Sequence, residues 1–103
     1  MNEATRIRAQ LAGDKATVRV LMNHDMESGQ RKDSSGKLIP AWHIQEVTVA
    51  LNGKTVLTVH LGPSMSKNPY LQFVLRGAKP GDRLTLAWVD NRGQRRSDDA
   101  LVT

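Results

Sequence analysis

The strongest constraint on how this chain can fold is the alternation of apolar and polar residues along most of its length. In residues 5–11 and 16–22 every second side chain is apolar, and short runs of turn-forming residues separate the alternating segments. A period of two is typical of a strand with one buried face. Strands are predicted at residues 5–11, 16–22, 42–51, 55–61, 70–76, 83–89 and 94–102. About seven short strands without a helix predict an all-β fold, an immunoglobulin-like β-sandwich.

The inward positions of these strands define the expected core. Seven of them are expected to be buried: Val18, Val20, Val49, Val59, Phe73, Leu86 and Trp88. A second apolar set occupies the opposite faces of the strands: Leu21, Val56, Val74 and Val89. A monomer with one buried face per sheet does not require this second set, so it indicates a surface that a partner covers.

The composition limits the number of domains and the classes of function. With 103 residues, the chain is predicted to form one domain, residues 1–103, which is long enough to bury a core. It contains no cysteine, which excludes disulfides and thiol chemistry carried by this chain. No apolar run is long enough for a membrane-spanning helix. The N-terminal residues lack the pattern of a secretory signal, which by itself indicates the cytoplasm.

The net charge of +5 raises the alternative of a nucleic-acid binder. The basic residues are, however, spread along several strands and loops, and the chain has only two Trp, one Tyr and one Phe. Proteins that bind single-stranded nucleic acids use exposed aromatic side chains as stacking platforms. A soluble basic surface, or one complementary to an acidic protein, is therefore favoured. No nucleic-acid or membrane partner is expected.

One segment breaks the alternation. Residues 24–40 read HDMESGQRKDSSGKLIP, with three basic residues, two glycines and a closing Ile39-Pro40. Loops of this length are uncommon in compact domains and are usually functional or disordered. The ordering of Met, Gly and Arg-Lys-Asp within it argues against disorder, so this is the candidate functional loop. Met26 is expected either to plug one end of the sandwich or to dock in a partner.

No residue pattern indicates an active site. His24, His43 and His60 match no metal-binding spacing and are expected to be loop or surface histidines. The carboxylates form no evident pair, and the serines lie in loop-like sequences without a nucleophile elbow. We therefore predict that the chain is not an enzyme and that it binds no cofactor and no metal.

Five motifs, taken together, are informative about the family. They are HDMESGQRKD at residues 24–33, GKLIP at residues 36–40, NGK at residues 52–54, NPYLQF at residues 68–73 and WVD at residues 88–90. From about Arg6 to the C-terminal end, the chain resembles the SoxZ family, the small subunits of the SoxYZ sulfur carrier of bacterial thiosulfate oxidation. Residues 41–43 are less basic than is usual in that family.

The resemblance implies a non-catalytic sandwich that pairs with a SoxY-like subunit in a heterodimer. In that family the SoxY chain carries covalent sulfur intermediates on a cysteine near the end of a flexible, glycine-rich arm. The resemblance further implies a periplasmic location, export together with the SoxY-like partner, and transient contacts with other Sox pathway enzymes. The alternatives are a stand-alone immunoglobulin-like protein-binding module, as a monomer or a homodimer, and a nucleic-acid binder.

The interface with the SoxY-like subunit is expected at the long loop and at residues 68–70. The candidate residues are Met26, Arg31, Ile39, Pro40, Asn68, Pro69 and Tyr70. Binding residues concentrate on ordered loops of rigid scaffolds, and Met, Tyr and Arg are enriched at interface cores. Arg31 is expected to pair with a carboxylate of the partner or to attract anionic sulfur species on its arm. Tyr70 is expected to pack on the core edge or to anchor the interface. Alternatively, the loop is ordered against its own sandwich and the partner docks on a strand face.

Overall fold

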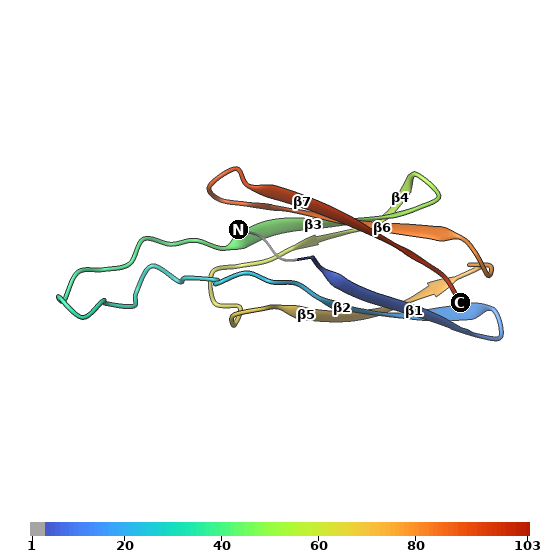
Figure 1. The fold of residues 1–103 in the computed structure, drawn as a ribbon, viewed down its shortest axis with the longest axis horizontal. Coiled ribbons are helices and arrows are strands. Elements are labelled where there is room, and N and C mark those ends of the chain that lie inside the picture. Colours follow the sequence, from blue (N-terminus) through green and yellow to red (C-terminus); the bar gives the residue numbers. More distant parts are fainter. Residues whose placement is uncertain (1–3) are drawn as a thin grey trace.

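The structure, a computed structural model, describes residues 4–103 and confirms the predicted all-β fold. The seven strands are β1 (Arg6–Ala12), β2 (Lys15–Leu21), β3 (Ile44–Leu51), β4 (Lys54–His60), β5 (Tyr70–Arg76), β6 (Arg83–Asp90) and β7 (Arg95–Leu101). They run along the long axis of a molecule that measures 53 × 21 × 21 Å (Figure 1). Residues 1–3 of the predicted domain 1–103 lie outside the described residues. Residues 4–103 include no helix that is long and apolar enough to span a membrane.

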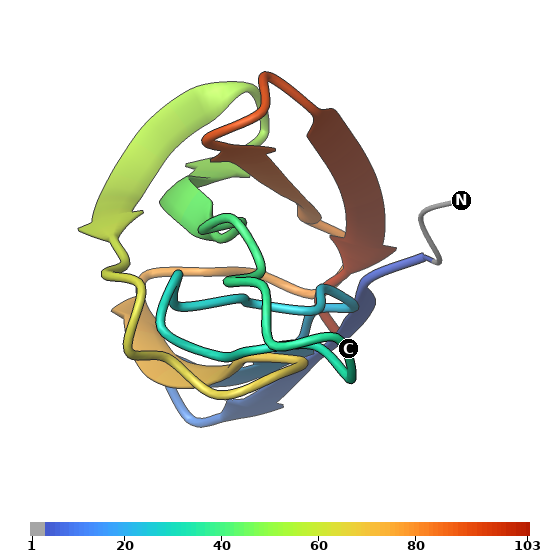
Figure 2. The same cartoon turned by 90° about the vertical axis from the view of Figure 1, so that its left-hand side faces the viewer.

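Two antiparallel sheets pack face to face (Figure 2). The first sheet has the strand order β1-β2-β5, and the second has the order β4-β3-β6-β7. Because β2 pairs with β5 and β3 pairs with β6, the chain passes from one sheet to the other after β2, β4 and β5. This arrangement is that of an immunoglobulin-like sandwich. The observed strand bounds differ from the predicted ones by at most two residues.

The core lies between the sheets and largely matches the predicted one. Five of the seven predicted core residues are buried: Val18, Val20, Val49, Leu86 and Trp88. The prediction is wrong for Val59 and Phe73, which are only partly buried although they pack against the core. The second apolar set lies on the outer faces as predicted, with Val56 and Val74 exposed.

Val59 and Phe73 are half-buried because the sandwich is closed along one side and open along the other. On the closed side, Thr103 beyond β7 donates to the carbonyl of Ala9 in β1 at 3.0 Å and accepts from the N–H of Leu11 at 2.8 Å. On the other side, β4 and β5 are edge strands of different sheets, and their inward side chains are all half-buried. Val59 on β4 and Phe73 on β5 line this open side.

Candidate functional site

The segment predicted as a long loop forms a narrow projection, residues 27–42, which we call the finger (Figure 1). Its two sides are joined by isolated β-bridges between Glu27 and Trp42 and between Lys32 and Leu38. The N–H of Glu27 donates to the carbonyl of Trp42 at 2.6 Å, and the reverse bond measures 2.9 Å. Every residue from 30 to 38 is exposed. Residues 30–38 are therefore ordered by hydrogen bonds within the finger and not by packing on the sandwich.

The tip of the finger is a turn organised by Asp33. Its Oδ1 accepts hydrogen bonds from the Ser35 hydroxyl at 2.7 Å, the Ser35 N–H at 2.9 Å and the Lys37 N–H at 3.0 Å. These bonds, above all the one from the Ser35 side chain, hold the pKa of Asp33 below its ordinary value. Gly36 has a φ of 85°, a left-handed conformation that glycine adopts without steric cost. The tip thus has a defined geometry set by its own sequence.

Arg31 forms an ion pair inside the finger. Its Nη2 lies 2.8 Å from Oε1 of Glu27, and its Nε lies 3.1 Å from Oε2 of the same carboxylate. The hydrogen bond from Arg31 lowers the pKa of Glu27 and raises that of Arg31. The predicted pairing of Arg31 with a partner's carboxylate stays a prediction, and such a pair would compete with this internal one.

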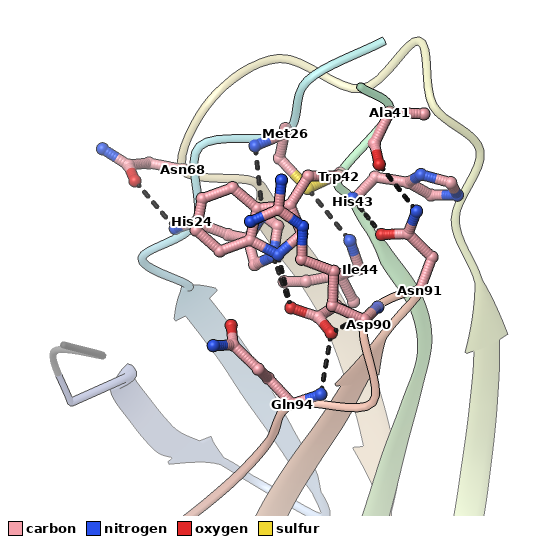
Figure 3. A network of polar contacts seen from close by, with 11 residues as sticks. His24, Met26, Ala41, Trp42, His43, Ile44, Asn68, Asp90, Asn91 and Gln94 are labelled. Carbon is pink, nitrogen blue, oxygen red and sulfur yellow. Dashed lines mark hydrogen bonds and ion pairs between the residues drawn. The ribbon is translucent and has the colours of Figure 1, made fainter. Parts of the chain in front are cut away.

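At the base of the finger, His24 and Asp90 meet in the interior (Figure 3). Nε2 of His24 lies 3.0 Å from Oδ2 of Asp90, and the two side chains are 1% and 0% exposed. The N–H of Met26 donates to Nδ1 of His24 at 3.0 Å. Nδ1 is therefore an unprotonated acceptor, so Nε2 carries the ring proton and donates a hydrogen bond to Asp90. The His24 ring also contacts the rings of Trp42 and Trp88, at centroid distances of 4.7 and 5.4 Å.

The Asp90 carboxylate accepts four hydrogen bonds. Besides His24, the indole N–H of Trp42 donates to it at 2.8 Å, and the backbone N–H groups of Arg92 and Gln94 donate at 3.0 and 2.9 Å. Burial by itself would raise the pKa of Asp90, but the bonds from His24, Trp42 and the two backbone groups outweigh it and hold the pKa below the ordinary value of 3.8. The Arg92 guanidinium lies 4.3 Å from the centroid of the Trp42 ring, a cation–π contact over the network.

Two residues in left-handed conformations fix the chain around this network. Met26 has a φ of 54° and Asn68 a φ of 55°, values that are uncommon for residues other than glycine. Sδ of Met26 accepts a hydrogen bond from the N–H of Ile44 at 3.3 Å. Asn68 bonds to His24 twice, through its Oδ1 to the His24 N–H at 3.0 Å and through its N–H to the His24 carbonyl at 2.8 Å. The segment before β5 is thereby tied to the base of the finger.

The predicted interface residues do not form one surface patch. Met26 and Pro69 are buried, so Met26 plugs the end of the sandwich, which is one of its two expected roles. Ile39 is half-buried, where its N–H donates to the carbonyl of Arg31 at 2.8 Å. Four of the predicted residues are exposed: Arg31, Pro40, Asn68 and Tyr70.

Tyr70 lies on the outer face of the first sheet and not on the finger. It is 51% exposed, and its hydroxyl lies 3.1 Å from Oε1 of Gln72. Its ring is thus not packed at the edge of the core, which was one of the two expected positions. The role of Tyr70 as an interface anchor stays a prediction.

The pair of His24 and Asp90 was not predicted from the sequence. The expectation of a surface histidine is wrong for His24, which lies in the loop after β2 but is buried and bonded to Asp90. The alternation of inward and outward positions, continued past the strand ends, contains a signal that could have predicted their burial. His24 and Met26 continue the inward positions of β2 past Met22, and Asp90 continues those of β6 past Trp88. An inward Asp at a strand end requires donors, because a buried carboxylate is costly without them.

This arrangement can anchor the finger, but it leaves no group free to react. Catalytic His–Asp pairs hold one imidazole nitrogen toward the nucleophile or substrate. Here both ring nitrogens of His24 are bonded within the chain, and the ring is buried. Within residues 4–103, no group of three or more His, Asp or Glu side chains is placed to hold a metal ion. The pair is a structural anchor that holds the base of the finger on the sandwich.

The lowered pKa of Asp90 predicts how the stability that this anchor contributes depends on pH. A carboxyl whose pKa is lower in the folded than in the unfolded state contributes stability above the unfolded pKa and loses it as the pH falls through the folded pKa. We expect the difference in unfolding free energy between the natural chain and Asp90→Asn to stay constant from pH 7 to 5 and to shrink below about pH 4. Urea titrations of both proteins across this range measure it; a difference that grows on acidification would contradict the assignment.

Comparison with known proteins places the chain in a family. Residues 5–100 match the family described as sulphur oxidation protein SoxZ, which is nearly the whole length. No curated protein matches the chain. Among solved structures, a superoxide reductase (neelaredoxin) from Ignicoccus hospitalis is similar, with a TM-score of 0.66 and 14% identity over 99% of this chain and 80% of that one.

A second similar structure supports the same fold. It is a hypothetical protein from Pyrococcus horikoshii OT3, with a TM-score of 0.65 and 17% identity over 99% of this chain and 89% of that one. At these identities, the two solved structures establish a shared sandwich fold and nothing about activity. The family match, by contrast, agrees with the resemblance carried by the motifs at the finger, before β5 and at the end of β6. The chain belongs to the SoxZ family and is a sulfur-oxidation subunit.

Proposed function

We propose that this chain is the non-catalytic subunit of a SoxYZ-type sulfur carrier. It would pair with a SoxY-like subunit whose arm cysteine carries covalent sulfur intermediates during thiosulfate oxidation. Membership of the SoxZ family supports the proposal. The chain contains no cysteine of its own, so covalent sulfur would have to be carried by the partner. The complex would act in the periplasm and be exported together with the partner.

The observation that carries the pairing is the finger. An isolated two-stranded hairpin is marginally stable in water, yet residues 30–38 of the finger are all exposed. At its base the finger is pinned by the His24–Asp90 network, and at its tip Asp33 fixes the turn. A projection that is anchored at its base and exposed along its length is suited to docking against a second chain. Because it is already ordered in the free chain, binding does not have to supply the conformational-entropy cost of ordering it.

Leu38 is the side chain of the finger best placed to anchor such a contact. It is 59% exposed, and it is paired across the finger with Lys32. Arg31 and Lys37 are exposed beside these two residues. An apolar side chain surrounded by charged ones matches the apolar centre and polar rim of protein interfaces.

The test compares Leu38→Asp with Leu101→Asp, a matched control. The two leucines are 59% and 58% exposed, but Leu101 lies at the end of β7. Co-expression with a SoxY-like chain from the same genome should give a one-to-one complex. Loss of a hot spot costs about 2–4 kcal/mol, so we expect Leu38→Asp to raise the Kd by about 30-fold to 1,000-fold in titration calorimetry. Leu101→Asp should leave the Kd unchanged.

Each other outcome decides between alternatives. If the natural chain forms no complex with the SoxY-like protein and sediments as a homodimer, the stand-alone binding module replaces the proposed carrier subunit. If the complex forms but Leu38→Asp binds as tightly as the natural chain, the interface lies off the finger. Circular dichroism of both variants checks that the sandwich stays folded, as expected for substitutions at exposed positions.

A further inference from the structure

The first sheet gathers the whole net charge of the protein. Its three strands contain no Asp or Glu and five basic residues, all exposed: Arg6, Arg8, Lys15, Arg19 and Arg76. The chain has 15 Lys and Arg against 10 Asp and Glu, so the rest of the chain is electrically balanced. The basic residues are spread over strands and loops, as the sequence indicated, but acidic residues balance them everywhere except on the outer face of β1, β2 and β5, which we call the basic face.

The register of the strands places three arginines side by side on the basic face. Arg8 is the direct cross-strand partner of Arg19, and Arg6 is that of Leu21, which in turn pairs with Tyr70 on β5. These side chains line a shallow hollow of about 340 Å³. The hollow lies at the end of the sheet that leads into the finger, because β2 ends at Leu21.

This arrangement costs the fold stability. Like charges directly opposite each other in an antiparallel pair are destabilising, and Arg8 and Arg19 are such a pair. Neither these two residues nor Arg6 forms an ion pair with any residue in the range 4–103. A local conflict of this kind, with no compensation inside the chain, indicates a use outside it.

We propose that the basic face docks an acidic surface of a second protein in a transient, salt-sensitive contact. The inference rests on the proposed function, because it assigns this face to the enzymes that exchange sulfur with the partner's arm. Complementary charge speeds association and is weakened by salt, which suits a carrier that must bind and leave several enzymes in turn. The position of the hollow beside the base of the finger brings such an enzyme next to the proposed subunit interface.

The side chains around the arginines favour a protein over a nucleic acid. Leu21 and Tyr70 are direct cross-strand partners next to the basic residues, and Val74 lies on the same face of β5 beyond Gln72; Tyr70 and Val74 are 51% and 53% exposed. Arg and Tyr beside apolar side chains are typical of protein interfaces. Tyr70 is the single aromatic residue on the outer face of this sheet, so successive bases would find only one stacking platform.

The test uses the complex of this chain with its SoxY-like partner and, as probes, purified sulfur-oxidation enzymes from the same organism. The variant Arg8→Glu with Arg19→Glu reverses the charge while keeping two like charges opposite each other. Its matched control, Lys54→Glu with Arg95→Glu, makes the same charge change on the second sheet. We expect the first variant to raise the Kd for at least one enzyme by about tenfold or more at about 50 mM NaCl, with the difference shrinking at about 200 mM. The control should bind as the natural complex does.

A further variant separates function from stability. Arg8→Glu alone creates an opposite-charge pair with Arg19, so it should raise the thermal midpoint of the chain and still weaken enzyme binding. If it raises the midpoint and leaves binding unchanged, the basic face is not a docking site. Equal binding by the double variant and the natural complex would also overturn the inference.

Two other outcomes of the experiment would assign the basic face to a different partner. If the double variant fails to form the subunit complex at all, the basic face belongs to the subunit interface and the inference fails. If a 30-base-pair DNA duplex or vesicles rich in anionic lipid bind through Arg8 and Arg19 while no enzyme does, a nucleic acid or a membrane replaces the protein partner. Formation of the subunit complex by the natural chain is tested first. If the natural chain forms no such complex, the result counts against the proposed function and not against the docking role of the basic face.

Discussion

Replacing Asp90 by alanine is expected to lower the free energy of unfolding by about 3–5 kcal/mol. The carboxylate is the common acceptor for His24, Trp42 and two backbone N–H groups, and removing it leaves the buried His24 donor and three part-buried donors without their partner. An unsatisfied buried donor costs about 1–3 kcal/mol, and bonds to a charged acceptor are at the upper end. Chemical denaturation of the isolated chain at pH 7 measures the loss.

The matched control is Asp99→Ala, because Asp99 is exposed on the neighbouring strand β7. It should change the unfolding free energy by less than about 0.5 kcal/mol. Asp90→Asn, which keeps the shape and one acceptor, should lie between the two and provides a folded variant if Asp90→Ala is too unstable. Hydrogen exchange of the Met26 and Glu27 amides should also quicken in Asp90→Asn. A loss below about 1 kcal/mol for Asp90→Ala would mean that the network does not pin the finger.

The sequence predicted the strands because the alternation records a buried face, and a buried face is what makes a strand part of a sheet. The finger could not be predicted in the same way. Both of its faces are in water from residue 30 to residue 38, so no alternation is required there, and its hairpin is defined by turn chemistry around Asp33 and by backbone bonds. The same stretch nevertheless carried one of the motifs by which the family was identified.

The second feature that the sequence could not predict is which strands lie next to each other. The basic face joins Arg6 and Arg8 of β1 to Arg76 of β5 through the pairing of β2 with both strands. Alternation predicts which side of a strand faces out, but it does not state which strands are neighbours. Charge that is scattered along the sequence therefore became one surface only when the strand order was known. Phe73 is a second example. The alternation correctly predicted that its side chain faces inward, but it could not predict that β5 is an edge strand, where an inward side chain is only half-buried.

The open side of the sandwich should make two leucines in one row of the second sheet differ strongly. Val49 is the cross-strand partner of Leu86 on β6 and of Leu57 on β4. Leu86 is completely buried, whereas Leu57 is half-buried on an edge strand. Leu86→Ala should therefore cost about 3–4 kcal/mol, because it leaves a cavity in the core, while Leu57→Ala should cost about 1–2 kcal/mol, because water already reaches that site.

Urea denaturation of the isolated chain measures both costs, and the identical change of side chain makes each variant the control of the other. The loss for Leu86→Ala is a large part of the 5–15 kcal/mol that stabilises a typical domain. Equal costs would contradict the open side, because they would mean that β4 and β5 close over Leu57 as completely as β1 and the end of β7 close the other side. A cost for Leu57→Ala that rises only in the complex with the SoxY-like subunit would instead place the partner across β4 and β5, where the half-buried side chains of both strands would gain the cover that the isolated sandwich lacks.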